Sequence, residues 1–237
     1  MKNQIAKSLV KMLALVLGIA CAQAPAQTFK RAKVQGGAAL VQVSSGGVSV
    51  WALASNGKPY VFNGNSFVLA NSVSLSQIAV GGGNAAQADA VWALNSSGSI
   101  FRALKSGGSW VFSQVSGSLD VIGVGPGYQD SCHPYEVWGL NSGSQIFRYN
   151  FCGNNFDQVP GLLCEINVGG GDVWGAQCNP DVFRFNFSTN AFVRIPGPFH
   201  SIPLLTVGPN GVWAIDTGST EVTSMIASWD SRTSMVI

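Results

Sequence analysis

Short apolar runs recur along the chain with a period of about 40 residues, which is typical of propellers and other repeat arrays. Each repeat contains a Val-Trp pair followed by a small residue. The five pairs place tryptophans at Trp51, Trp92, Trp138, Trp174 and Trp213. We therefore interpret each recurrence as one structural unit rather than as an isolated motif.

Two further features accompany the Val-Trp pair in a constant order. An apolar run that ends in glycines precedes the pair. Its copies are 41–47, 78–83, 122–127, 166–171 and 205–211. An aromatic residue followed by a Ser-Gly or Pro-Gly turn comes after the pair, as at Trp110, Phe156 and Phe192. Three features in the same order indicate that the units share one local fold.

Within one unit the pattern predicts four short strands, at 119–124, 137–140, 145–149 and 156–159. Glycines or an Asn-Ser-Gly sequence separate them, which favours tight reversals between antiparallel neighbours. The first two strands are almost continuously apolar, so both sheet faces must be covered, as they are in stacked propeller blades. No window outside the N-terminal segment has helical periodicity.

The sequence therefore predicts an all-β fold, a single β-propeller of four-stranded antiparallel blades. We expect five blades, because residues 27–237 supply about 42 residues for each. The predicted blades are 37–72, 73–116, 117–160, 161–198, and 199–237 together with 28–36. The last unit lacks a clear fourth-strand pattern, so we expect the N-terminal strand to close the ring. The tail at 222–237 fits the repeat poorly, and a degenerate third strand and a frayed end both stay open.

Residues 1–26 are predicted to be a secretory signal peptide. Lys2, Lys7 and Lys11 accompany an apolar run, and an Ala-Pro-Ala sequence ends at Ala26. The apolar run is too short to span a bilayer. Cleavage near Ala26 would release the protein to the periplasm, the cell surface or the medium. Lipid anchoring at Cys21 is a less favoured alternative, because the residues before it form a poor lipobox.

The charge of the chain argues against two classes of partner. The whole chain has 13 basic and 11 acidic residues, a formal net charge of +2. Three of the lysines and no acidic residue lie in the signal peptide, which leaves ten basic and eleven acidic residues and a net charge of −1. A charge this small does not attract nucleic acid or anionic lipid.

Four cysteines remain in the mature chain, at Cys132, Cys152, Cys164 and Cys178. An even number in an exported protein predicts two disulfides. Reflecting the chain about the predicted hairpin turns brings Cys132 near Cys152 and Cys164 near Cys178, and we expect these pairings among the three possible connectivities. The long spacings between the cysteines argue against a zinc site, and so does the small number of histidines, two in the whole chain.

The repeat also resembles that of a known family. Val-Trp-Gly-Leu-Asn-Ser-x-x-x-Ile-Phe-Arg-Tyr-Asn-Phe at 137–151, Phe-Asp-Gln-Val-Pro-Gly at 156–161, and Ile-Asn-Val-Gly-Gly-Gly-Asp-Val-Trp-Gly at 166–175 closely resemble the tectonin β-propeller repeat. The resemblance covers roughly residues 29–216. Family members include fish-egg lectins, horseshoe-crab lectins, and fungal and slime-mould tectonins. The resemblance implies a secreted or surface lectin that recognises microbial glycans, lipopolysaccharide sugars or methylated sugars. Because many tectonin propellers have six blades, six is the alternative to five.

Two kinds of repeated residue are candidates for sugar binding. Aromatic rings stack on pyranose faces and amides bond hydroxyls, which singles out the tryptophans and the polar residues three positions later. The candidates are Trp92, Asn95, Trp138, Asn141, Trp174, Gln177, Trp213 and Asp216. The favoured alternative is structural: the tryptophans pack one blade on the next, and the polar side chains bond the backbone of their turns. Several weak equivalent sites would still raise avidity on a clustered glycan surface.

Arginines recur on the predicted third strand at Arg102, Arg148 and Arg184. They could meet phosphate or acidic sugars, although a solvated face with local carboxylate partners is the favoured interpretation.

Catalysis has little support, because carboxylates do not recur as a pair within a repeat and no nucleophile elbow is present. We expect a non-enzymatic, lectin-like protein that binds glycans and needs no cofactor or metal. The alternative is an envelope scaffold that binds a polypeptide at the rim of the propeller where these polar residues are expected. The third hypothesis is a sugar-active enzyme. The sequence leaves the sugar and the oligomeric state open.

Overall fold

The computed structural model describes residues 31–46, 49–82, 90–126, 130–197, 203–208, 211–216 and 222–225. The chain divides between Ala32 and Lys33, and the fold described below is that of the described residues from Lys33 onward. The predicted signal peptide at 1–26, including Cys21, lies outside the described residues. No helix in the described part of the chain is long and apolar enough to cross a membrane.

The described residues from Lys33 onward form five β-sheets and one short 3-10 turn, η1 (Gln35–Gly37). Blade 1 contains β1 (Lys33–Val34), β2 (Leu40–Gly46), β3 (Ser49–Ala54), β4 (Pro59–Phe62) and β5 (Ser66–Leu69). Blade 2 contains β6 (Gln77–Gly81), β7 (Ala90–Leu94), β8 (Ser99–Ser106) and β9 (Ser109–Ser118). Blade 3 contains β10 (Val121–Gly125), β11 (Glu136–Leu140), β12 (Gln145–Asn150) and β13 (Asn155–Leu162). Blade 4 contains β14 (Glu165–Gly169), β15 (Asp172–Ala176), β16 (Val182–Asn186) and β17 (Ala191–Ile195), and blade 5 contains β18 (Pro203–Gly208), β19 (Gly211–Asp216) and β20 (Val222–Met225).

From β2 onward, successive strands of each blade pair antiparallel with their neighbours in the chain. In blade 3, for example, Val121 of β10 pairs with Leu140 of β11, and Trp138 of β11 pairs with Arg148 of β12. The prediction of an all-β chain built from four-stranded antiparallel blades is confirmed. Four blades have at least four described strands and the fifth has three.

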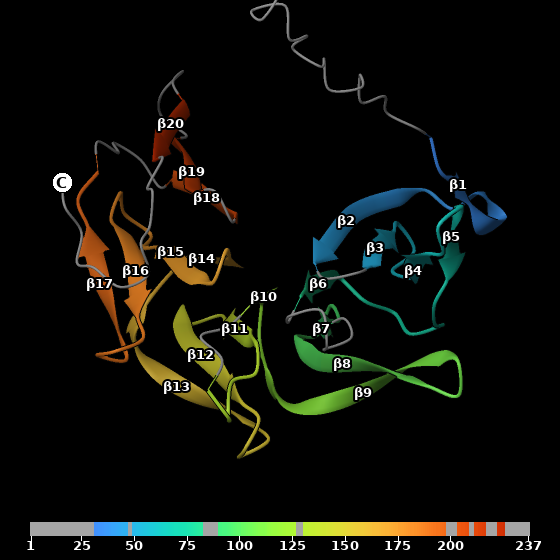
Figure 1. Ribbon diagram of the computed structural model, residues 1–237, viewed down its shortest axis with the longest axis horizontal. Helices are drawn as coiled ribbons and strands as arrows, with labels where there is room; N and C mark the ends of the chain where they lie inside the picture. Colours follow the sequence, from blue (N-terminus) through green and yellow to red (C-terminus); the bar gives the residue numbers. More distant parts are fainter. Residues whose placement is uncertain are drawn as a thin grey trace, which may run out of the picture. The chain divides into compact units, whose positions relative to one another are not determined.

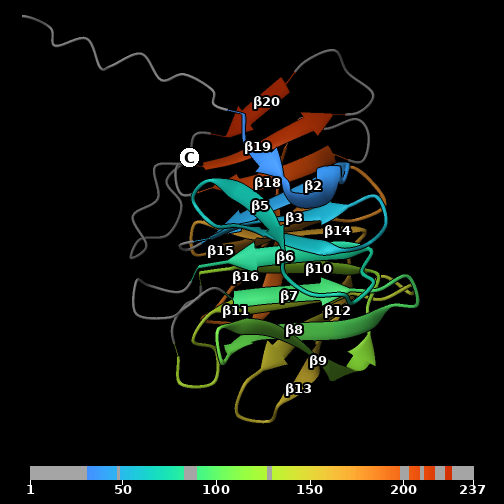
Figure 2. The ribbon, with the colours of Figure 1, turned by 90° about the vertical axis from the view of Figure 1, so that its right-hand side faces the viewer.

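The strands β2, β6, β10, β14 and β18 face a common centre, and the strands β5, β9, β13 and β17 lie at the periphery (Figure 1). The inner strands β2, β6, β10, β14 and β18 are neighbours in that order. In Figure 2, β6, β7, β8 and β9 of blade 2 lie one below the other in chain order, and β2, β3 and β5 of blade 1 lie above them. Because each inner strand from β2 to β14 touches the next, residues at the same position of blades 1 to 4 face similar surroundings.

Glycines at the ends of the inner strands allow this close approach. A Cβ added to Gly81 would lie 2.7 Å from the backbone nitrogen of Gly125, and one added to Gly125 would lie 2.7 Å from a methyl group of Val168. Contacts this short are not tolerated between real side chains. The sequence pattern indicated tight reversals at these glycines, which is wrong here because the β6–β7 and β10–β11 connections span 82–89 and 126–135. The contact between neighbouring inner strands is the requirement that the structure shows for glycine at these positions.

Polar side chains also bridge neighbouring inner strands. The Gln42 side chain donates to the carbonyl of Ile78 and accepts from its N–H, at 2.9 and 3.0 Å. Gln77 makes the same pair of bonds with Ile122, at 3.3 and 3.2 Å. Such bonds satisfy backbone groups that face the centre and fix the register of one blade against the next.

The hydrophobic core lies between the blades rather than inside one of them. Trp51 and Leu53 of blade 1 share a cluster with Ile78, Val80 and Val91 of blade 2. Equivalent clusters join blade 2 to blade 3, blade 3 to blade 4, and blade 4 to blade 5. The near-continuous apolar inner strands of the sequence are therefore explained by burial on both faces.

The predicted closure of the ring by the N-terminal strand is wrong for Lys33 and Val34. These residues pair in parallel with Ser66 and Phe67 of β5, the outer strand of blade 1. The Leu69 N–H also donates to the side chain of Gln35 at 3.2 Å, which holds the segment there. The free edge of β5 is thus satisfied within blade 1, and the remainder of the predicted closing strand, 28–30, lies outside the described residues.

The structure contains both predicted disulfides. Cys132 is joined to Cys152, with Cα atoms 5.0 Å apart, and Cys164 to Cys178, with Cα atoms 5.3 Å apart. The first links the segment before β11 to the segment after β12, and the second links the segments that flank the β14–β15 hairpin. Two disulfides are typical of a protein that folds in an oxidising compartment.

Replacing Cys132 and Cys152 together by serine is expected to lower the free energy of unfolding by about 3 kcal/mol, because the open chain gains conformational entropy when unfolded. The bond closes a loop with a sequence separation of 20. Urea denaturation would measure the loss. A double variant as stable as the oxidised protein would contradict this expectation, and adding a reductant should destabilise the parent more than the variant.

Candidate functional site

Four of the five repeated tryptophans are completely buried. Trp51, Trp92, Trp138 and Trp174 have 0% exposure, and Trp213 has 48%. The Trp92 ring meets Tyr149 of the next blade edge-on at 4.6 Å between centroids. The interpretation of Trp92, Trp138 and Trp174 as exposed sugar platforms is therefore wrong, because their faces are covered. Packing of one blade on the next is their role, and Trp213 differs because no described sheet follows blade 5.

Each buried tryptophan of blades 3 and 4 is accompanied by an arginine and a carboxylate. Arg148 lies opposite Trp138 in the strand pairing and forms an ion pair with Glu136, at 2.6 and 2.8 Å. Glu136 is 0% exposed and also accepts from the Trp138 indole at 2.7 Å. The guanidinium of Arg148 lies 5.5 Å from the Trp138 ring centre. We call such a group of tryptophan, arginine and acceptor an inter-blade cluster.

The cluster of blade 4 has the same composition but is more open to solvent. Arg184 lies opposite Trp174 and binds Asp172 at 2.7 and 3.0 Å. The side chains of Arg184 and Asp172 are 29% and 16% exposed, compared with 10% and 0% for Arg148 and Glu136. This cluster therefore presents a planar cation and a carboxylate to solvent beside an apolar interface, a combination suited to sugar hydroxyls.

Blade 2 departs from this pattern. Arg102 lies opposite Trp92, but Ala90 stands where the next two blades have Glu136 and Asp172. The Trp92 indole donates instead to the hydroxyl of Tyr135, a residue of blade 3, at 3.3 Å. Burial raises the pKa of Tyr135, and the positive charge of Arg102 partly opposes that rise.

The polar candidates that follow the tryptophans hold turns. The Asn95 side chain accepts from the N–H groups of Ser97 and Ser99, at 3.0 and 2.8 Å. Asn141 likewise accepts from Gly143 and Gln145, at 3.1 and 3.0 Å. These bonds support the alternative that such residues stabilise the turn between the second and third strands.

The other two polar candidates give less information. The side chain of Gln177 accepts from Asn179 at 3.3 Å in the corresponding turn of blade 4. The side chain of Asp216 lies outside the described part of the chain. Of the candidates whose side chains are described, the buried tryptophans lie between blades and the polar residues lie in turns, and none of them lines the pocket described below.

A cavity of about 410 Å³ lies along the centre of the propeller, between the inner strands. Its polar lining includes Gln42, Ser44, Gln77, Glu165 and Asn167. Several of these groups already bond a neighbouring blade; Glu165, for example, accepts from the N–H of Leu205 at 2.9 Å. Because these lining groups already hydrogen-bond a neighbouring blade, we consider the inter-blade clusters a better candidate site for a ligand than the cavity.

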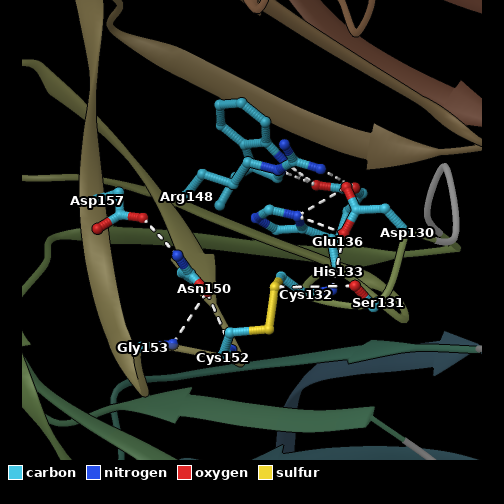
Figure 3. Close-up of polar contacts among 11 residues, drawn as sticks. Asp130, Ser131, Cys132, His133, Glu136, Arg148, Asn150, Cys152, Gly153 and Asp157 are labelled. Atoms are coloured by element: carbon cyan, nitrogen blue, oxygen red, sulfur yellow. Dashed lines mark hydrogen bonds and ion pairs between the residues drawn. A yellow bond between two sulfur atoms is a disulfide. The ribbon is translucent and has the colours of Figure 1, made fainter.

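The loop before β11 is fixed by polar contacts around the first disulfide (Figure 3). Asp130 and His133 form a pair at 2.9 Å, and the N–H of Cys132 donates to Asp130 at 2.8 Å. Burial alone would raise the pKa of Asp130, but His133 and the backbone donors outweigh it and lower the pKa. On the other side of the disulfide, Asn150 accepts from the N–H of Cys152 at 3.0 Å. The loop that carries Tyr135 toward blade 2 is thus rigidly anchored.

The sequence singled out the arginines but not their acceptors. Glu136 and Asp172 were missed because single carboxylates carry no local motif. The signal that could have identified them is their constant place two residues before Trp138 and Trp174. Among the described residues, no group of three or more His, Cys, Asp or Glu side chains could hold a metal ion.

Comparison with known proteins places this geometry in a family. A family model described as the tectonin domain matches residues 26–191. No curated protein sequence matches the chain.

Three solved structures resemble the fold. Human WBSCR16 is similar with a TM-score of 0.54 and 12% identity, over 71% of this chain and 56% of that chain. The WD40 β-propeller domain of Doa1 has a TM-score of 0.54 and 11% identity, over 81% of this chain and 64% of that chain. The SapL1 lectin in complex with alpha methyl fucoside has a TM-score of 0.51 and 13% identity, over 80% of this chain and 82% of that chain. At these identities the likeness concerns the fold alone, which it confirms as a propeller. The chain spans 56% of the WBSCR16 chain.

Proposed function

The chain belongs to the tectonin family, and from this premise we propose that it is a secreted carbohydrate-binding protein of the lectin type. The match of the tectonin domain model to residues 26–191 is the observation that carries the proposal. The SapL1 lectin, whose structure contains alpha methyl fucoside, has the same fold and is consistent with it. The glycans we propose are microbial or methylated ones, which include lipopolysaccharide sugars.

We place the binding sites at the inter-blade clusters rather than at the turn residues. Asn95 and Asn141 have their amide oxygens bonded within their own turns, whereas Arg184 and Asp172 are partly exposed. A guanidinium and a carboxylate side by side can donate to and accept from adjacent sugar hydroxyls. Because related clusters recur around the ring, several weak sites would act together on a surface with many glycans.

Replacing Arg184 by methionine is expected to weaken glycan binding about tenfold, because charged hydrogen bonds to the sugar are lost while the aliphatic stem is kept. The purified protein would be tested on an array of microbial and methylated glycans, with competition by free sugar. Arg194→Met is the matched control. Arg194 lies in the same blade and pairs with Asp181, but its side chain is 60% exposed and lies on the outer strand β17.

Two results would count against the proposal. A folded protein that binds no glycan on the array would favour the alternative, a scaffold that binds a polypeptide partner. Equal losses for Arg184→Met and Arg194→Met would show that the inter-blade cluster is not the site, even if the protein is a lectin.

A further inference from the structure

In the part of the chain that the structure describes, no carboxylate is paired with the positive charge of the inter-blade cluster between blades 2 and 3. Among the described residues, no acidic side chain forms an ion pair with Arg102, whereas Arg148 and Arg184 each have one. The Nε atom of Arg102 is buried and has no hydrogen-bond partner among the described residues. In Arg148 and Arg184 that same atom donates to Glu136 and Asp172, at 2.8 and 3.0 Å.

Tyr135 replaces only part of the missing carboxylate. Its hydroxyl accepts from the Trp92 indole, as Glu136 accepts from Trp138. A neutral hydroxyl satisfies the indole but leaves the charge of Arg102 uncompensated. The Arg102 guanidinium also hydrogen-bonds this hydroxyl, but because the hydroxyl carries no charge the cluster keeps a net positive charge.

The surroundings of Arg102 strengthen its demand for an anion. The guanidinium lies 5.9 Å from the centre of the Trp92 ring and 5.2 Å from that of Phe151. Aromatic faces stabilise a cation but remove water from it, so an unpaired charge there is costly. Arg102 is nevertheless partly exposed, so a ligand can reach it.

A second hydroxyl near Arg102 is already satisfied. The Tyr149 O–H donates to Asn154 at 2.5 Å. Burial raises the pKa of Tyr149, and the positive charge of Arg102 partly opposes that rise. Because the Tyr149 hydroxyl is bonded to Asn154, the donors left for a ligand are the exposed N–H groups of Arg102.

We propose that the Arg102 cluster binds a carboxylate on a glycan, such as that of a uronic acid, which takes the part that Glu136 and Asp172 play in the next two blades. This inference deepens the proposed function and rests on it. A carboxylate fits because the protein itself uses one at both equivalent positions. The ligand carboxylate accepts from the solvent-exposed part of the Arg102 guanidinium, since Tyr135 is only 7% exposed and its hydroxyl is already used within the cluster.

Titration of the purified protein with methyl glucuronide, followed by calorimetry and by the NMR signal of the arginine Nε–H groups, tests the proposal. We expect methyl glucuronide to bind at least about tenfold more tightly than methyl glucoside, because a charged hydrogen bond adds affinity. Binding should shift one arginine Nε–H signal, and that signal should be absent from Arg102→Met. Glucose 6-phosphate forms the third arm. Tighter binding of the phosphate than of the uronate would overturn the choice of carboxylate.

Ala90→Glu supplies the missing carboxylate from within the chain. We expect it to abolish methyl glucuronide binding, and Arg102→Met to do the same, while Arg194→Met leaves it unchanged. Equal affinity for glucuronide and glucoside, or no change in Arg102→Met, would overturn the inference.

The two proposals fail in different ways. Binding of neutral glycans on the array without a preference for glucuronide would leave the lectin proposal standing and reject the carboxylate site. Binding of glucuronide at Arg102 by a protein that binds no glycan on the array would support the carboxylate site and reject glycan recognition at the other clusters.

Discussion

Replacing Trp138 by alanine is expected to lower the free energy of unfolding by about 4 kcal/mol, the usual cost of deleting a large buried aromatic side chain. Trp138 has 0% exposure and meets Phe185 and Phe192 of blade 4 edge-on, at 4.6 and 5.7 Å between ring centres. Its loss would leave a cavity at the interface and deprive Glu136 of the indole N–H. Chemical denaturation followed by circular dichroism would measure the change.

Trp213→Ala provides a control with the same change in composition. Trp213 occupies the same place in its repeat but is 48% exposed, so less apolar surface leaves water when the protein folds. We expect a loss of about 1 kcal/mol for this variant, near the centre of the range for point substitutions. Similar losses for the two variants would mean that position in the repeat, rather than burial between blades, determines what the tryptophan contributes.

The contrast between these tryptophans shows what the sequence could predict. The spacing of the Val-Trp pairs was sufficient for the propeller, because each repeat must bury its apolar strands against neighbours. It also favoured packing over ligand binding for Trp138. It could not distinguish Trp213, because the exposure of that side chain depends on whether another sheet covers it.

The inter-blade clusters were beyond the sequence for a different reason. Arg148 and Glu136 are twelve positions apart and meet only because β11 and β12 pair with Trp138 opposite Arg148. A shift of one residue in that register would point the arginine to the other face. That Tyr135 takes the place of a carboxylate in the cluster of blade 2 is even harder to predict from the sequence, because Tyr135 belongs to the next blade.

The partner of the N-terminal strand was predicted wrongly for a similar reason, because the sequence does not show which strands pair. Residues around Lys33 resemble an outer strand, and two sheet edges could receive one. Blade 1 provides an edge at β5 that lies close in sequence, and pairing there is favoured because the loop to be closed is short. Local composition defines the strand but does not specify its partner.

Glu136→Gln is expected to lower the free energy of unfolding by about 4 kcal/mol, because it leaves the charge of Arg148 buried without a counterion. Arg148 is 8% exposed and Glu136 is 0% exposed, so water can screen little of that charge. A glutamine keeps the size of the side chain but offers one acceptor oxygen in place of the two that bind Arg148 and Trp138. Urea denaturation at neutral pH would measure the loss.

Two comparisons separate the charge from the packing. Asp172→Asn removes the equivalent carboxylate of blade 4, where the arginine is 29% exposed, and we expect a loss of at most about 1 kcal/mol. Adding Arg148→Met to Glu136→Gln should recover most of the stability, because replacing both partners of a buried pair costs far less than removing one. If the double variant were as unstable as Glu136→Gln alone, the lost hydrogen bond of Trp138, rather than the unpaired charge, would account for the effect. The ion pair would then contribute to the orientation of the indole between blades, and the uncompensated charge of Arg102 would be less costly than we argue.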